Sequence, residues 1–229
     1  MKCNPFLDFI YLMFPDLCVI CGRNLQKNEH LLCLSCLVDI PKTNFHLMPD
    51  NPIEKRFWGK VPVCRATAYF FFQKGSSFQK LLHLLKYQGN KEIGEIMGKY
   101  AAVDLMDIPE FASVDLIIPV PLHPKKYKSR GYNQSEWIGK GISFILNKPQ
   151  DTSTLVRVKE NPSQTKKTVF ERFENTEGIF ELKDTILLEG KHILLVDDVL
   201  TTGSTLEACI RTLIKTKNIK ISIFALAVA

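Results

Sequence analysis

The stretch Ile193-Leu-Leu-Val-Asp-Asp-Val-Leu-Thr-Thr-Gly-Ser-Thr205 decides the fold of this chain. Its first four residues are apolar, as in a strand that is buried on both faces of a parallel sheet. Two acids, four hydroxyl side chains and a glycine follow, before an amphipathic run begins near Leu206. A buried strand, a polar turn and a helix start bring backbone N–H groups together. The pattern therefore predicts an α/β fold with an anion site after this strand.

The polar residues of this stretch suit a sugar phosphate. Gly203 permits a turn with positive φ. Asp197 and Asp198 suit the vicinal diol of a ribose, and they could also meet Mg²⁺ directly or through its waters. We expect both acids to lie at a solvent-facing strand end. The alternative is an ordinary strand-to-helix turn in which Asp or Ser caps the helix. Hydroxyl donors for a phosphate surround the glycine: Thr201, Thr202, Ser204 and Thr205.

Residues 196–205 resemble the signature with which type I phosphoribosyltransferases bind phosphoribosyl pyrophosphate (PRPP). In that family the acid pair faces the ribose hydroxyls, and the following loop wraps the 5-phosphate. The resemblance therefore implies that Asp197 and Asp198 bind the ribose and that Thr201–Thr205 bind the phosphate.

Length and composition allow one α/β domain and a small additional unit. The chain has 229 residues, 45% of them hydrophobic, which is enough to bury a full core. Its net charge of +6 is compatible with phosphorylated ligands or nucleic acid and proves neither. No apolar run reaches the length of a membrane span, so we expect no integral membrane segment. Asp8 interrupts the apolar N-terminus, which favours a short amphipathic helix over a signal peptide and predicts a cytoplasmic protein.

Two Cys-x2-Cys pairs, Cys18 with Cys21 and Cys33 with Cys36, are separated by eleven residues. Four thiolates in two such pairs suit tetrahedral Zn²⁺ in a closed structural site. Disulfides are one alternative, disfavoured by the absence of a secretory signal. A redox role is another, weakened because neither pair lies in a thioredoxin-like βαβ unit. The spacing therefore predicts a small zinc-ribbon-like module.

We assign this module and a linker to residues 1–62, and the larger domain to residues 63–229. Prolines, asparagines and a glycine interrupt any long element between residues 37 and 62. Aromatic residues in this segment, Phe57 among them, suggest that it packs against the domain. In the larger domain, periodicity predicts strands at 66–72, 116–120, 155–158, 179–182 and 219–228, the last closing the sheet, and helices at 78–87, 93–105, 134–146 and 206–214.

A second polar loop is expected beside the acid pair. Ligands of open α/β sheets bind beyond the carboxyl ends of the strands, so the strand at 116–120 should end in the same crevice. Pro121, Leu122 and His123 follow this strand in what we expect to be a rigid, proline-rich loop. His123 could contact an anion or simply be exposed.

Basic residues at positions 125–130 come next, and Arg130 is the last of them. A departing pyrophosphate needs cationic donors of this kind, although a basic cluster can also be a solvated surface. The charged stretch 159–175 has little hydrophobic periodicity and is expected to be a lid or a disordered segment. Its candidate ligand-binding residues are Gln164, Lys166 and Arg172.

Nearly the whole chain resembles the ComF family of competence-associated proteins. The resemblance rests on the four cysteines and on a series of short motifs: Leu85-Lys-Tyr-x-Gly89, Pro119-Val-Pro-Leu-His-Pro124, Arg130-Gly-Tyr-Asn-Gln134, Gln164, Arg172-x2-Asn-x2-Gly-x-Phe180 and Val196–Gly203. It implies a zinc-ribbon-like part followed by an amidophosphoribosyltransferase-like domain, in a protein linked to DNA uptake. It also implies that Lys86, which would otherwise count as a solvated lysine at a helix end, binds PRPP.

Two functions remain open from the sequence. In the first, the protein is a phosphoribosyltransferase that moves ribosyl 5-phosphate from Mg²⁺-bound PRPP to an acceptor and releases pyrophosphate, with Asp197, Asp198 and Arg130 as catalytic residues. In the second, it is a non-catalytic PRPP- or nucleotide-sensing factor for the import of single-stranded DNA, acting with competence-machinery proteins. No aromatic and basic stacking platform for DNA stands out in the sequence.

Overall fold

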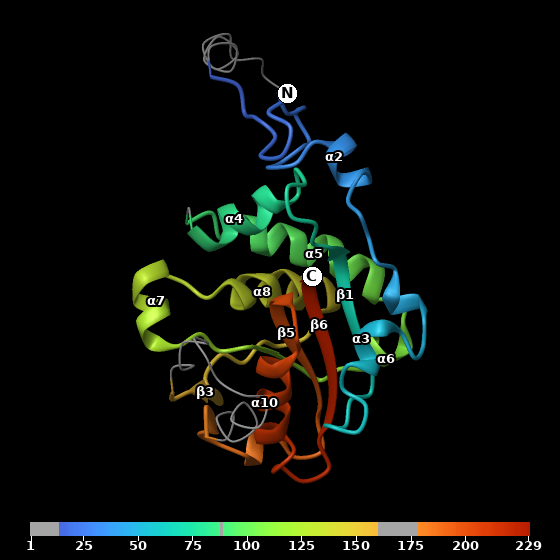
Figure 1. Ribbon diagram of the computed structural model, residues 1–229, viewed down its shortest axis with the longest axis vertical. Helices are drawn as coiled ribbons and strands as arrows, with labels where there is room; N and C mark the ends of the chain where they lie inside the picture. The colour runs from blue at the N-terminus through green and yellow to red at the C-terminus, as the bar shows by residue number, and fades with distance from the viewer. Residues whose placement is uncertain (1–13, 88, 160–177) are drawn as a thin grey trace.

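The computed structural model describes residues 14–87, 89–159 and 178–229 (Figure 1). Two predicted features lie outside these residues. One is the N-terminal amphipathic helix. The other is the charged stretch, with Gln164, Lys166 and Arg172.

A four-stranded, all-parallel sheet forms the core of the larger domain. This confirms the predicted α/β fold, a parallel sheet flanked by helices. The strand order is β1-β6-β5-β2, with β1 at Ala66–Phe71, β2 at Leu116–Pro119, β5 at His192–Leu200 and β6 at Lys220–Val228. The prediction that the last strand closes the sheet is wrong, because β6 lies between β1 and β5. Its residues after Lys220 are all buried, as expected for a strand covered on both faces.

Two further predicted strands do not join this sheet. β3 (Leu155–Arg157) and β4 (Phe180–Leu182) pair with each other in a separate antiparallel sheet. Each buries only its first residue, so these strands cover the core rather than extend it.

Alternate side chains of each strand point to opposite faces of the sheet, and each face has its own helices (Figure 1). Helices α4 (Gln79–Tyr87), α5 (Glu92–Leu105) and α8 (Gln134–Leu146) cover one face. Helix α10 (Ser204–Leu213) and the small β3–β4 sheet cover the other. The remaining short helices are α2 (Leu34–Val38), η1 (Phe45–Leu47), α3 (Pro52–Lys55), α6 (Pro109–Ala112), α7 (Pro124–Arg130) and η2 (Ile186–Leu188).

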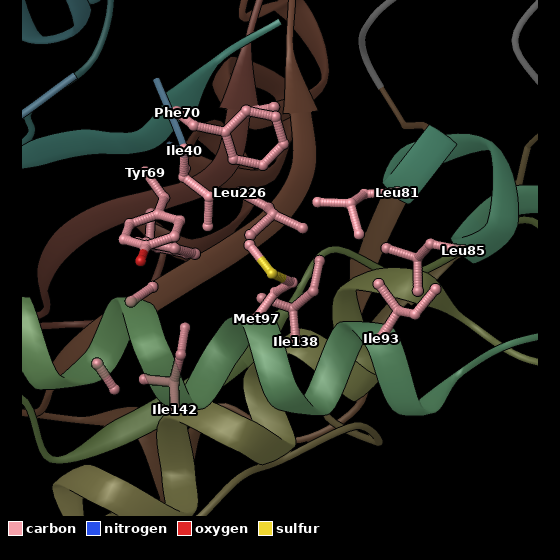
Figure 2. Close-up of a cluster of buried hydrophobic side chains, with 14 of the residues drawn as sticks. Ile40, Tyr69, Phe70, Leu81, Leu85, Ile93, Met97, Ile138, Ile142 and Leu226 are labelled. Atoms are coloured by element: carbon pink, nitrogen blue, oxygen red, sulfur yellow. The ribbon is translucent and has the colours of Figure 1, made fainter. Parts of the chain in front are cut away.

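Figure 2 shows how the first face is filled: Met97 of α5 and Ile138 of α8 lie next to Leu226 of β6. Helices α5 and α8 pack backbone to backbone here. A Cβ atom on Gly98 or Gly141 would overlap the backbone of the other helix. This close contact fixes α8, whose first turn reaches the candidate site.

The cysteine-containing module packs beyond α4, with Ile20 and Leu32 in the same apolar cluster as that helix. The segment after it runs along the outer edge of β1, where the Thr43 N–H donates to the Tyr69 carbonyl (3.0 Å) and the Phe71 N–H to that of Pro41 (2.9 Å). The boundary assigned at residue 62 stays a prediction. Among the described residues, no helix has the length and apolar character needed to cross a membrane.

Candidate functional site

The acid pair lies at the carboxyl end of β5, beside the end of β2. β5 continues through both acids to Leu200, because its parallel pairing with β6 extends to Leu200, which lies opposite Val228. β2 pairs with β5 up to Pro119 opposite Val196, and the Val120 N–H then donates to the Val196 carbonyl (2.8 Å). The loop of Pro121, Leu122 and His123 therefore leaves the sheet next to the acids, and all three of its residues are half-buried.

Asp197 is more enclosed than a residue at a solvent-facing strand end. Its Oδ1 accepts hydrogen bonds from the Ser135 hydroxyl (3.1 Å) and from the Asp198 N–H (2.9 Å). Burial, together with the charge of Asp198, raises the pKa of Asp197 from 3.8 to about 7. Asp197 is therefore half-buried: Ser135 in the first turn of α8 covers one side of it, and its other side lines the hollow at the end of β5.

Asp198 is paired with a cation from a distant helix. Lys86, in the last turn of α4, places its Nζ 3.1 Å from Oδ2 of Asp198. The end of α4 is fixed in turn by the Tyr132 hydroxyl, which donates to the Leu85 carbonyl. Two short motifs far apart in the sequence thus meet over the acid pair.

Arg130 belongs to the same group of side chains. Its guanidinium lies 5.6 Å from the centre of the Tyr87 ring, and its Nη1 donates to Oε1 of Gln134 (2.8 Å). Gln134 precedes Ser135, which contacts Asp197, so Arg130 is linked to the site through the start of α8, whereas Lys86 contacts the acid pair directly.

The basic residues before Arg130 form helix α7, an element that the sequence analysis did not predict. Pro124 at the first turn and Gly131 (φ 79°) after the last residue are the start and stop signals of this helix. His123 is its N-cap, and its Nδ1 accepts the Lys125 N–H (3.3 Å).

Residues Thr201–Thr205 form the wall of a hollow that opens at the end of β5; Asp197, Val199, Leu200 and Leu206 complete its lining. Gly203 has φ 82°, which confirms the predicted positive φ. It also occupies the N-cap position of α10 and offers no capping side chain. The alternative of a helix capped by Asp or Ser is therefore wrong. Helix α10 begins at Ser204 rather than near Leu206. The Ser204 N–H donates to Thr202 Oγ1 (3.4 Å), and the amides of Thr205 and Leu206 are left for a ligand or solvent.

Two residues that sequence reasoning missed touch this turn. The guanidinium Nη1 of Arg56 donates to the Thr201 carbonyl, across 145 positions of sequence. The buried ring of Phe57 lies against Gly203. No local pattern points to Arg56, and Phe57 was expected only to pack against the domain, because both belong to the segment that was taken for a linker. Ser135 was also missed, although it directly follows the Arg130–Gln134 motif.

The four cysteines converge in the N-terminal module. Their sulfur atoms all lie within 4.8 Å of one another, and those of Cys21 and Cys33 are 3.7 Å apart. Tetrahedral Zn²⁺ with Zn–S bonds of about 2.3 Å places its sulfurs roughly 3.8 Å apart, so the cluster fits this metal. Burial raises the pKa of Cys18, but N–H donors of Cys21, Cys33 and Ile20 outweigh it and lower that pKa to about 6, which favours a thiolate.

Comparisons with known proteins agree with this geometry. Residues 132–229 match the family model described as phosphoribosyl transferase domain. Competence protein F of Haemophilus influenzae is 31% identical over 212 residues, which cover 92% of this chain and 83% of the relative. DNA utilization protein YhgH of Escherichia coli O157:H7 is 26% identical, covering 87% and 84% of the two chains. Competence protein ComFC of Bacillus subtilis is 26% identical, covering 92% and 77%. The chain therefore belongs to the competence protein F (ComF) family and carries a phosphoribosyl transferase domain in its carboxyl-terminal part.

Proposed function

We propose that this protein binds PRPP with Mg²⁺ at the end of β5 and transfers its ribosyl 5-phosphate group to an acceptor, releasing pyrophosphate. The observation that carries the proposal is the meeting of three features at one edge of the sheet. These are the acid pair, the hollow around Gly203 where α10 begins without a side-chain cap, and Lys86, which is paired with Asp198; Arg130 lies nearby, against Tyr87 and Gln134.

Each feature has a role in binding. Asp197 and Asp198 accept hydrogen bonds from the ribose hydroxyls. The amides and hydroxyls of Thr201–Thr205 hold the 5-phosphate at the start of α10. The loop of Pro121, Leu122 and His123 borders the ribose from the β2 side.

The carboxylates also fit Mg²⁺, which prefers oxygen ligands. Asp198 disfavours the ionised form of Asp197, so a cation beside the pair would relieve their repulsion. When bound, Mg²⁺ neutralises charge on the pyrophosphate of PRPP.

In the reaction, the bond between the anomeric carbon and the pyrophosphate oxygen breaks, and its electron pair leaves with pyrophosphate. A lone pair of the acceptor forms the new bond to the anomeric carbon. Positive charge develops on the sugar, where the carboxylates of Asp197 and Asp198 stabilise it. Lys86 and Arg130 stabilise the negative charge of the leaving group. The four cysteines take no part, and their zinc serves the fold of the N-terminal module.

Calorimetric titration with PRPP and Mg²⁺ tests the binding site. Losing a charge-assisted hydrogen bond costs roughly 1.5–3 kcal/mol, so the double variant Asp197→Asn, Asp198→Asn should bind PRPP about ten- to a hundredfold more weakly. Equal affinity in the double variant and the parent would refute the diol assignment.

Pyrophosphate release from PRPP, measured against a panel of bases and amines, tests the transfer. A parent protein that binds PRPP and releases no pyrophosphate with any acceptor would favour the sensing function.

One observation favours the second candidate function, a nucleotide-sensing factor that contacts single-stranded DNA. Lys91, the N-cap of α5, and Lys140 of α8 lie 4.7 Å and 4.4 Å from the centre of the Trp137 ring. Lys99 of α5 lies 4.9 Å from the centre of the exposed Phe144 ring. The sequence did not indicate such a platform, because its members are on two helices. Relatives named for competence and DNA utilization make this partner reasonable. Binding of a labelled oligonucleotide that is unchanged in Phe144→Ala would argue against this surface.

A further inference from the structure

The short helix α3 is firmly attached to the start of β1. Asn51 caps it: its Oδ1 accepts the N–H groups of Ile53 (2.9 Å) and Glu54 (3.1 Å). Its Nδ2 also donates to the Ala66 carbonyl (2.9 Å). Glu54 accepts the Ala66 N–H (3.1 Å) and forms an ion pair with Arg65 (3.3 Å). Asn51, Glu54 and Arg65 are all buried, so this attachment is part of the core.

From this anchored helix, the next two residues reach the phosphate turn. Arg56 donates to the Thr201 carbonyl. Phe57 is 1% exposed, and its Cζ lies 3.2 Å from where a Cβ on Gly203 would be. The turn is thus held from outside by a carbonyl contact at its first residue and a ring against its glycine.

The turn also needs positive charge that its own residues lack. The residues lining the hollow include Asp197 and neither lysine nor arginine; Arg56 lies just outside this lining, against the Thr201 carbonyl. Within residues 14–87, 89–159 and 178–229, Arg56 is the one cationic side chain that hydrogen-bonds the Thr201–Thr205 backbone. Nor does it form an ion pair with any residue of these ranges. A guanidinium has five N–H donors, and the Thr201 carbonyl engages one nitrogen, which leaves donors for a phosphate oxygen.

We propose that Arg56 is a ligand-binding residue of the phosphate site, contacting the 5-phosphate of the sugar phosphate while it holds the Thr201 carbonyl. This inference rests on the proposed PRPP site and adds to it a residue from the segment between the cysteine module and the sheet. It assigns Arg56 to the 5-phosphate end of the ligand, whereas Lys86 and Arg130 serve the pyrophosphate end.

The two ends of the ligand can be tested separately, by calorimetric titration with ribose 5-phosphate and with Mg²⁺-pyrophosphate. Arg56→Gln should weaken ribose 5-phosphate binding about ten- to a hundredfold and leave pyrophosphate binding within about twofold. Arg56→Lys keeps the charge without the planar fork, so its loss should be intermediate. Lys55→Gln is the matched control, because it removes the same charge one residue earlier from an exposed side chain that contacts Trp58. It should change neither affinity.

Three other outcomes of these titrations would overturn the assignment of Arg56. If Arg56→Gln and Arg56→Lys bind ribose 5-phosphate as the parent does, the assignment of Arg56 is wrong and the proposed function stands. Equal losses for both ligands would reduce Arg56 to a structural support of the whole site and overturn the assignment. A parent protein that binds neither PRPP nor ribose 5-phosphate would overturn the proposed function and this inference with it.

Discussion

Replacing Asp197 by Asn should stabilise the unliganded protein. Burial and the charge of Asp198 raise the pKa of Asp197 from 3.8 to about 7, so the ionised carboxylate is unfavourable in the folded state. Asn has nearly the same size and keeps an oxygen that accepts the hydrogen bonds of Ser135 and of the Asp198 N–H. The substitution therefore removes the charge and retains the contacts.

The size and pH range of the effect follow from the pKa. A rise of about three units corresponds to roughly 4 kcal/mol of unfolding free energy at full ionisation. When folding raises the pKa of an acid, the acid does not destabilise the fold below its pKa in the unfolded chain, here 3.8, because it is protonated in both states. The penalty grows as the pH rises from 3.8 and is complete above about 7. Asp197→Asn should therefore be about 2–4 kcal/mol more stable than the parent at pH 8 and nearly equal to it at pH 4.

Urea unfolding at several pH values, in buffer without magnesium or PRPP, measures this difference. Asp151→Asn is a control of opposite sign. Burial raises the pKa of Asp151, but hydrogen bonds from Thr154 and Ser153 outweigh it and lower that pKa below 3.8. Its carboxylate stabilises the fold above its usual pKa, and the contribution is lost as the pH falls below that value. Asp151→Asn should thus be less stable than the parent at pH 8. An Asp197→Asn protein no more stable than the parent at pH 8, or one whose gain is the same at pH 5 and pH 8, would refute the reasoning.

Three further substitutions, two of them with a matched control, test other parts of the structure. The parent should contain about one zinc per chain, and Cys33→Ser should lose zinc and stability while its folded fraction keeps PRPP affinity; stoichiometric zinc in a variant lacking all four cysteines would contradict this. Gly203→Val, at φ 82° and against a buried ring, should cost about 1–3 kcal/mol or more and weaken ribose 5-phosphate binding. Gly75→Val, at φ 85° with open space around it, should incur the backbone strain alone and leave binding unchanged. Tyr132→Phe removes the hydrogen bond that fixes the end of α4, so it should cost about 1 kcal/mol and lower PRPP affinity, whereas Tyr127→Phe on the exposed α7 should do neither.

The parts of the site that are local in sequence could be predicted. The four apolar residues from Ile193 to Val196 specify a strand buried on both faces, and Gly203 alone signals the left-handed turn before α10. The spacing of the two cysteine pairs likewise predicted the convergence of the four sulfur atoms. In each case a few neighbouring residues determine the geometry.

The parts that depend on contacts between distant segments could not be predicted. Arg56 and Thr201 are 145 positions apart, and the linker containing Arg56 has no periodicity that would place it on the sheet. The enclosure of Asp197 depends on Ser135, which α8 carries to β5 only because α8 packs closely on α5. Partial burial of a residue at a strand end is a property of its tertiary neighbours, so the sequence could not show that a helix covers one side of Asp197.

The same burial connects the stability of the protein with its ligand. In the unliganded state, Asp197 and Asp198 repel each other, and Lys86 offsets only part of that repulsion, since the pKa of Asp197 stays near 7. A ligand that brings hydroxyl donors and a cation to the pair favours the ionised form, so binding should relieve the penalty that Asp197→Asn removes by substitution. The acid pair therefore lowers the stability of the unliganded fold, and ligand binding recovers that free energy. The stability penalty and part of the binding free energy thus arise from the same charge on Asp197. It follows that Asp197→Asn should separate them, giving a protein that is more stable when empty and gains little stability from PRPP with Mg²⁺.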